Sequence, residues 1–349
     1  MSGSKASLRT AYFLGAGVSA AVCRRAVVTK NLLSVALEAR ASLSGFPDVD
    51  VAEELVRFLA SRGQEPAIDD VLSLIDVALA ADLSLSPAWQ AHRLADVRGS
   101  LSRLIYDCIQ TTVHGGGPTE NNPLKVLLSK CQREFGIAII TLNWDCLVEL
   151  TFKRLHGQRD GLIDYGIPCM NDSGDPFAVD SGALLVLKPH GSLSWGHCPL
   201  CGVVVADLTQ PFDFTKERPC PICPGVPLQF VLVPPVPFSR PWPWFLSSLW
   251  KRVEDAIYDS DRLVFIGYSF PPQDVGVRIH LIRAMARRQQ RKGASPLKVE
   301  IVTKNESAGS NDAEGTLNRY LSMLGGLVGR EHFSLYQQGF SNWVTEIGS

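Results

Sequence analysis

The sequence has little of several features that mark membrane, nucleic-acid-binding or repetitive proteins. It contains no apolar run of the roughly 20 residues that a membrane-spanning helix needs. Its 34 basic and 35 acidic residues leave a net charge of −1, so no overall field attracts nucleic acid or an anionic membrane. Neither an internal repeat nor a low-complexity tract interrupts it. With 46% hydrophobic and 20% charged residues, the 349 residues are expected to build a packed globular core.

The N-terminus admits two interpretations. Two basic residues precede an apolar stretch at positions 11–23, as in a secretory signal peptide. Gly15, Gly17 and Ser19 interrupt that stretch, which a strand followed by a glycine turn explains equally well. Because later motifs supply partners for such a turn, we favour the second interpretation and expect a cytoplasmic protein.

The nine cysteines are an odd number and are unevenly placed, which does not suit a disulfide framework. Four of them form two tight pairs, Cys198 with Cys201 and Cys220 with Cys223, separated by 18 residues. This is the spacing of a tetrahedral structural zinc site. Four thiolates leave no open coordination position, so we expect the zinc to hold the fold and take no part in catalysis. An iron centre or a redox pair is the alternative.

Short apolar runs typical of buried strands alternate with helical patterns. We expect strands at residues 10–14, 136–141, 183–187, 228–233, 262–266 and 297–302. Helices are expected at residues 146–155, 244–258 and 277–291. This alternation predicts the fold class α/β, with a Rossmann-like, doubly wound parallel sheet.

Apolar side chains at helical spacing fill the stretch between the first two expected strands. We interpret this stretch as a helical insertion, for which packing is the simplest role. The predicted parts are a Rossmann-like core (1–30, 114–194 and 226–310), the helical insertion (31–113), a zinc-binding module (195–225) and a C-terminal extension of helix and strand (311–349).

Small or polar residues follow four of the expected strands, at the sheet edge where ligands of open parallel sheets collect. Gly15-Ala16-Gly17 would let backbone amides approach a diphosphate, although Ala20 replaces the third glycine of the usual pattern, and an ordinary tight turn needs the same glycines. The other strand ends carry Asn143 with Asp145, Gly267 with Ser269, and Asn305. Asp145 alone would suit a helix cap.

His190 follows the expected strand at 183–187 directly. This position makes it a candidate general base, although a histidine after a strand often only satisfies hydrogen bonds. His197 is the rival, but it adjoins the first cysteine pair and is assigned a structural role.

The order of these motifs resembles that of the sirtuin family over residues 10–310. The motifs are Gly15-Ala-Gly-Val-Ser19, Thr141-x-Asn143-x-Asp145, His190-Gly191, the two cysteine pairs and Gly267-x-Ser269. The resemblance implies a phosphate-binding loop for NAD (Gly15, Ala16, Gly17 and Ser19), residues beside the nicotinamide ribose (Asn143 and Asp145), a catalytic base (His190) and a site for the adenosine half (Gly267, Ser269 and Asn305).

Three departures separate the chain from the protein deacylases of that family. Ala20 to Arg25 replaces their Ile-Pro-x-Phe-Arg loop, and Leu142 stands where they usually carry Gln. The prolines of residues 233–237 stand where deacylases pair with the acyl-lysine peptide, and proline has no amide hydrogen to offer a substrate strand. The segments around His190 and at 266–274 look more like the bacterial sirtuin-like branch, whose members hydrolyse NAD, often in antiphage defence.

We therefore expect an NAD glycohydrolase with NAD as substrate and Zn2+ as a structural ion. Asn143 would hold the ribose or the attacking water, and His190 would activate a hydroxyl or water. A protein deacylase using the same residues is the first alternative, and a non-catalytic NAD or ADP-ribose sensor is the second. Because free NAD cleavage would poison its own cell, we also expect control by homo-oligomer formation or by a second defence protein.

Overall fold

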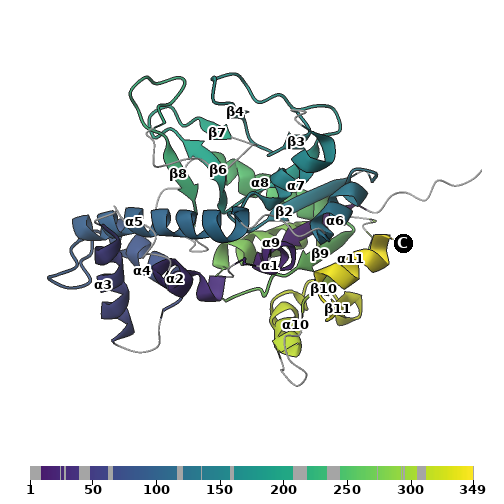
Figure 1. Ribbon diagram of the computed structural model, residues 1–349. Coiled ribbons are helices and arrows are strands. Elements are labelled where there is room, and N and C mark those ends of the chain that lie inside the picture. The colour runs from purple at the N-terminus through teal and green to yellow at the C-terminus, as the bar shows by residue number, and fades with distance from the viewer. Residues whose placement is uncertain are drawn as a thin grey trace, which may run out of the picture.

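The computed structural model of the chain describes residues 9–23, 25–26, 29–38, 48–61, 66–115, 121–134, 136–157, 161–206, 218–233, 244–272, 274–291, 293, 295–304 and 312–348. In these ranges a central sheet with flanking helices carries a second, smaller sheet and a group of helices that extends to one side (Figure 1). None of the helices in these ranges is long and apolar enough to cross a membrane.

The central sheet has seven strands, all parallel, in the order β11-β10-β9-β1-β2-β5-β3. The strands are β1 (Thr10–Leu14), β2 (Ile137–Thr141), β3 (Ile163–Asp164), β5 (Leu184–Leu187), β9 (Arg262–Ile266), β10 (Lys298–Val302) and β11 (Phe333–Tyr336). β1 and β2 are buried along their whole length, as expected for strands covered on both faces. The predicted parallel α/β fold is confirmed, and its order brings the carboxyl ends of β1, β2 and β9 side by side.

Two groups of helices pack with this sheet. The first group is α1 (Ala16–Val22), α6 (Pro123–Cys131), α7 (Leu147–His156) and α11 (Phe340–Gly348), in which α6 contacts the other three. The second is α8 (Trp244–Asp259) and α9 (Val275–Gln289), which pack against each other. α1 follows β1, α7 follows β2 and α9 follows β9, so each strand end that meets at the centre of the sheet leads into a helix.

Further helices occupy much of the stretch between α1 and α6. They are α2 (Thr29–Glu38), α3 (Asp48–Ala60), α4 (Ile68–Ala80), α5 (Ala91–Ile109) and a π-helical turn, η2 (Gln110–His114), that continues α5. The long α5 contacts α2, α3 and α4, and the group extends to the left of the sheet in Figure 1. Leu94, Val97 and Leu101 on α5 are fully buried because their shared face meets these three helices.

The second sheet has the order β4-β7-β6-β8. Its strands are β4 (Cys169–Met170), β6 (Gly191–His197), β7 (Val204–Ala206) and β8 (Gln229–Leu232). The expectation that residues 228–233 add a strand to the alternating, parallel sheet is wrong, because β8 pairs antiparallel with β6. The apolar run at 228–233 is compatible with a strand of either sheet. Its partner β6, which is rich in glycine and serine, was not predicted as a strand.

The C-terminal part of the chain belongs to the central sheet. After α10 (Asp312–Leu324) and the short 3-10 turn η3 (Arg330–His332), β11 pairs with β10 as the edge strand. The Tyr320 hydroxyl on α10 donates a hydrogen bond of 3.0 Å to the backbone carbonyl of Tyr268, and its ring stacks on Phe270. α10 therefore supports the loop between β9 and α9.

Candidate functional site

A cavity of about 100 Å³ lies where β1, β2 and β9 end. Six residues that the sequence singled out line it, namely Gly15, Ala16, Ser19, Asn143, Asp145 and His190. They come from the turn after β1 and the following α1, from the loop after β2 and from the residue before β6. Segments more than 100 residues apart in the sequence therefore meet at one place. The structure thus brings together most of the predicted site, at the sheet edge where the sequence placed it.

The glycine loop after β1 packs directly on the turn after β9. A Cβ atom on Gly15 would lie 2.6 Å from the carbonyl oxygen of Gly267, and one on Gly17 would lie 2.7 Å from its Cα atom. The amide of Gly15 donates to the carbonyl of Ile266, and that of Gly17 donates to the carbonyl of Gly267. These two glycines therefore serve the close approach of two loops, and their amides are already paired.

Asn143 and Asp145 join the loop after β2 to the loop after β1. The side-chain amide of Asn143 donates to the backbone carbonyl of Gly15 (2.9 Å) and to Oγ of Ser19 (3.1 Å). Ser19 in turn donates a 2.5 Å hydrogen bond to Oδ2 of Asp145, while Oδ1 accepts from the amide of Leu147, the first residue of α7. The polar groups beside the cavity are thus held in one network before any ligand binds.

A buried ion pair holds the loop after β2 in place. Lys188 and Glu149 are 0% and 1% exposed, and Nζ of Lys188 lies 2.8 Å from Oε1 of Glu149. The same ammonium donates a 2.6 Å hydrogen bond to the backbone carbonyl of Asp145. Burial lowers the pKa of Lys188, but Glu149, Cys146 and Asp145 together raise it above its ordinary value, so the ammonium stays charged. Sequence reasoning did not assign either residue a role.

His190 is 5% exposed and faces a carboxylate. Its Nε2 lies 3.6 Å from Oδ1 of Asp274, and the ring meets Trp250 edge-on. Burial lowers the pKa of His190, but the charges of Asp274 and Asp69 and hydrogen bonds to Asp274 and the Leu142 backbone raise it above its ordinary value. A histidine made more basic in this way, at the wall of a cavity, is suited to accept a proton.

Asp274 is a site residue that the sequence did not single out, although the Ser-Phe-Pro-Pro-x-Asp segment contains it. It is 2% exposed and begins α9, where Oδ1 accepts from the amide of Val277. Oδ2 accepts a 2.6 Å hydrogen bond from the hydroxyl of Tyr268. These bonds hold the carboxylate toward His190, in the manner of a residue that orients a base.

Asp69 is the second missed residue, and it comes from the helical insertion. It lies in the first turn of α4 and lines the same cavity as His190 and Asp274. Burial, with the nearby Asp274, raises the pKa of the Asp69 carboxyl to about 7, although His190 lowers it. Its only sequence signal was its place at a helix start, which also suits a simple favourable interaction with the helix dipole.

Two residues predicted for the adenosine half, Gly267 and Ser269, do not line the cavity, and neither does Gly17 of the glycine loop. Gly267 lies under the glycine loop with a positive φ of 59°, and Ser269 is exposed in the next turn, where its carbonyl accepts from Arg319. Asn305 lies outside the described residues. The assignment of Gly267, Ser269 and Asn305 to the adenosine half of NAD remains a prediction.

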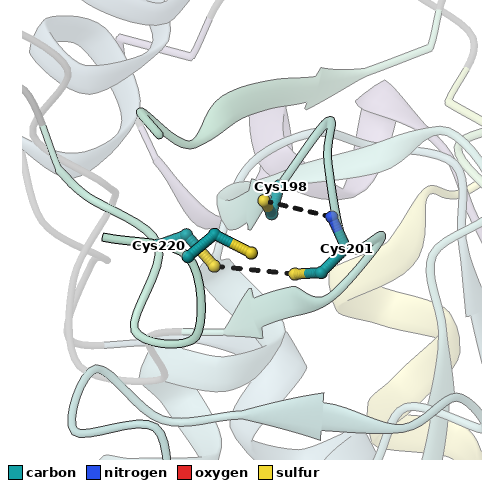
Figure 2. Close-up of side chains that lie close together, drawn as sticks. Cys198, Cys201 and Cys220 are labelled. Atoms are coloured by element: carbon teal, nitrogen blue, oxygen red, sulfur yellow. Dashed lines mark hydrogen bonds between the residues drawn. The ribbon is translucent and has the colours of Figure 1, made fainter. Parts of the chain in front are cut away.

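The four paired cysteines form a cluster beside the second sheet. Their Sγ atoms all lie within 4.8 Å of one another, and those of Cys201 and Cys220 are 3.6 Å apart (Figure 2). A zinc ion with four bonds of about 2.3 Å separates its sulfur ligands by about 3.8 Å. Backbone amides of Cys201 and Ile222 point at Sγ of Cys198 and Cys220, which suits thiolates. Thus the cluster could hold zinc, and the donor set fits that ion.

Comparison with known proteins gives no match to a family profile and none to a curated protein. Among solved structures, the chain is similar to Sir2 proteins. A mutant Sir2 homologue bound to ADP-ribose is 14% identical with a TM-score of 0.45, covering 98% of this chain and 91% of that one. A Sir2 homologue–NAD complex is 14% identical with a TM-score of 0.41, at the same coverage. A Sir2 structure with a p53 peptide and NAD+ is 12% identical, with a TM-score of 0.42.

Proposed function

We propose that this chain is an NAD glycohydrolase, which cleaves NAD to nicotinamide and ADP-ribose. The observation that carries the proposal is the meeting of three sequence motifs in one cavity. The Gly-Ala-Gly-x-Ser, Thr-x-Asn-x-Asp and His-Gly segments contribute Ser19, Asn143, Asp145 and His190 to its wall. The order of these motifs along the chain is the basis of the resemblance to sirtuins. In the structure, residues from all three motifs line the same cavity.

The arrangement supports a simple division of labour in hydrolysis. As nicotinamide leaves and positive charge develops on the ribose, water attacks C1′ and passes a proton to His190, and the C1′–nitrogen bond breaks. Asp274 orients the imidazole and raises its basicity. Asn143, held by Gly15 and Ser19, places its amide beside the ribose or the water. Such general-base help contributes typically about 10²–10⁴-fold.

The backbone at Val233 supports hydrolysis over deacylation. Its amide donates to the carbonyl of His190 (2.9 Å), and its carbonyl accepts from the indole of Trp144 (3.3 Å). Both backbone groups are therefore engaged within the protein at the start of the segment where deacylases bind a peptide strand. The prolines that follow lie outside the described residues, and their sequence adds no amide donor.

Incubation of the purified chain with NAD tests the proposal. Nicotinamide release without any peptide supports hydrolysis, whereas release only with an acyl-lysine peptide would show a deacylase. Binding of NAD without turnover would show a sensor. The His190→Ala variant, assayed in parallel, excludes a contaminating enzyme as the source of activity.

The remaining parts of the proposal concern zinc and biological role. The cysteine cluster is proposed to bind one structural Zn2+. The sequence resemblance to bacterial sirtuin-like proteins supports a cytoplasmic role in NAD depletion during antiphage defence.

Control of the activity would come from a homo-oligomer or a second defence protein. Measuring specific activity against protein concentration tests this control, since a constant value from nanomolar protein upward would contradict it.

A further inference from the structure

Three carboxylates line the cavity, and two of them are already committed. Both oxygens of Asp145 accept hydrogen bonds, from Ser19 and from the Leu147 amide. Both oxygens of Asp274 are likewise engaged, by Tyr268 and by the amide at the start of α9. Hydrogen bonds within the protein occupy both carboxylates, so neither has an oxygen left entirely for a ligand.

Asp69 differs from them. Among the described residues, none donates a hydrogen bond to its carboxylate, whereas its backbone carbonyl accepts from Ser73. It reaches the cavity from α4, in the helical insertion, and faces His190 and Asp274. A partly buried carboxylate in a wall without a basic residue is available to pair with a bound cationic group.

The charge around the cavity indicates what that group is. No Lys or Arg occurs among the described residues of its wall, which carries Asp69, Asp145, Asp274 and a single histidine. The cavity of about 100 Å³ is small enough that a ring bound in it lies close to these side chains. Oxidised NAD carries a positive charge on its nicotinamide ring, and the reduced form has a neutral ring of nearly the same shape.

We propose that Asp69 is a specificity-determining residue of this site, whose carboxylate faces the cationic nicotinamide ring and selects oxidised over reduced NAD. The inference rests on the proposed function, because it takes NAD as the substrate. It gives the helical insertion a part in recognition, beyond the packing role that its sequence suggested. Asp274, by contrast, acts on the substrate through His190.

Binding of hydrolysis-resistant carba-NAD+ and of its reduced form tests the proposal on the full chain. Wild type should prefer the oxidised analogue, and Asp69→Asn should lose roughly tenfold of that preference, or about 1.4 kcal/mol. Asp70→Asn is the matched control, because Asp70 is the next residue of the same helical turn but is exposed and does not line the cavity. Thermal melting of both variants verifies that they are folded.

The pH dependence gives a second measurement. The charged groups that act on Asp69 are His190 and Asp274, which line the same cavity, and the exposed Asp70 beside it in the helix. A bound cation favours the charged carboxylate, so affinity for carba-NAD+ should rise with pH through the Asp69 pKa of about 7. Affinity for the reduced analogue should change less, and Asp69→Asn should weaken the difference.

An unchanged ratio of the two affinities in Asp69→Asn, equal to that of Asp70→Asn, would overturn the proposal while wild-type NAD cleavage left the proposed function standing. If wild type binds neither analogue and cleaves no NAD, the function itself is wrong and this inference falls with it. A reduced ratio in Asp69→Asn supports both.

Discussion

The cavity and the cysteine cluster differ in the amount of packed structure that supports them. At the cavity, Asn143 donates to the backbone of Gly15 after β1, and Asp145 accepts from Ser19 of α1, next to a large buried sheet. The cysteine cluster has only a small apolar core, made of Cys198, Val205, Cys220 and Leu228. Loss of a side chain at the cavity should therefore lower activity and leave the fold intact, whereas loss of a cysteine at the cluster should disrupt local structure and leave activity intact.

The largest effect is expected from removing the proposed base. His190→Ala should lower NAD cleavage about 10²–10⁴-fold, because the proposed general base is then missing. Asn143→Ala should also abolish cleavage, since its amide is the group placed beside the ribose. Measurement of nicotinamide release, with circular dichroism and thermal melting, checks both. An unfolded variant, or one that cleaves NAD at the wild-type rate, would remove the role assigned to that residue. The exposed His92 provides the control substitution His92→Ala, which should change neither quantity.

A second prediction concerns the buried ion pair beneath the cavity. Lys188→Met leaves the Glu149 carboxylate buried without its partner, which typically costs about 3–5 kcal/mol of unfolding free energy. The double variant Lys188→Met/Glu149→Gln should recover part of it, because no charge is then left buried. Chemical denaturation measures both.

The exposed pair of Lys251 with Asp255 is the matched control for that measurement. Lys251→Met should cost less than about 0.5 kcal/mol, because water screens an exposed pair on one helix. Equal costs for the two lysine substitutions would show that Lys188 contributes no more than a surface charge.

The cysteine cluster provides the converse test. Cys220→Ser should lower the metal content from about one zinc per chain toward none, because three thiolates leave a weaker, open site. Stability should fall with the metal, while NAD cleavage by the folded fraction should remain near wild type, since the cluster is not part of the cavity wall. Metal analysis of protein purified without chelator, together with melting and activity, provides the comparison. Wild-type protein free of zinc would contradict it.

The smallest effect is a shift in pH dependence. Cleavage should fall as the pH drops through the raised pKa of His190, because the imidazole must be neutral to accept a proton. Asp274→Asn removes the carboxylate that raises this pKa most, so the inflection should move to lower pH. A profile of kcat/KM against pH measures the shift. An inflection unchanged in Asp274→Asn would assign the titration to another group.

The parallel strands could be predicted because burial on both faces makes their sequences continuously apolar. Residues 10–14 and 262–266 match β1 and β9 in full for this reason. The two-residue strands β3 and β4 are too short to carry a pattern, and β8 was placed in the wrong sheet because pairing partners are not encoded in one run. The C-terminal strand β11 is only half-buried at the edge, so its signal was weak.

The site could be predicted only where its residues belong to compact motifs. His190 and Asn143 stand directly after strands, and the sheet edge then brought them together. Asp69 and Asp274 stand at the starts of two helices distant in sequence, where an aspartate is common for capping and dipole reasons alone. Only the packing of α4 and α9 shows that both of them lie in the same cavity wall as His190.

The close contact between the Gly15–Gly17 loop and the Gly267 turn has a consequence for sequence change over evolutionary time. A side chain on either glycine of the first loop meets main-chain atoms of the second turn, and one on Gly267 meets main-chain atoms of Gly17 and Val18. A clash with a neighbouring side chain can be relieved by shortening that side chain, but no second substitution shortens a backbone. These three positions therefore have no compensating partners, and descendants of this sequence should keep all three glycines while the surrounding residues diverge.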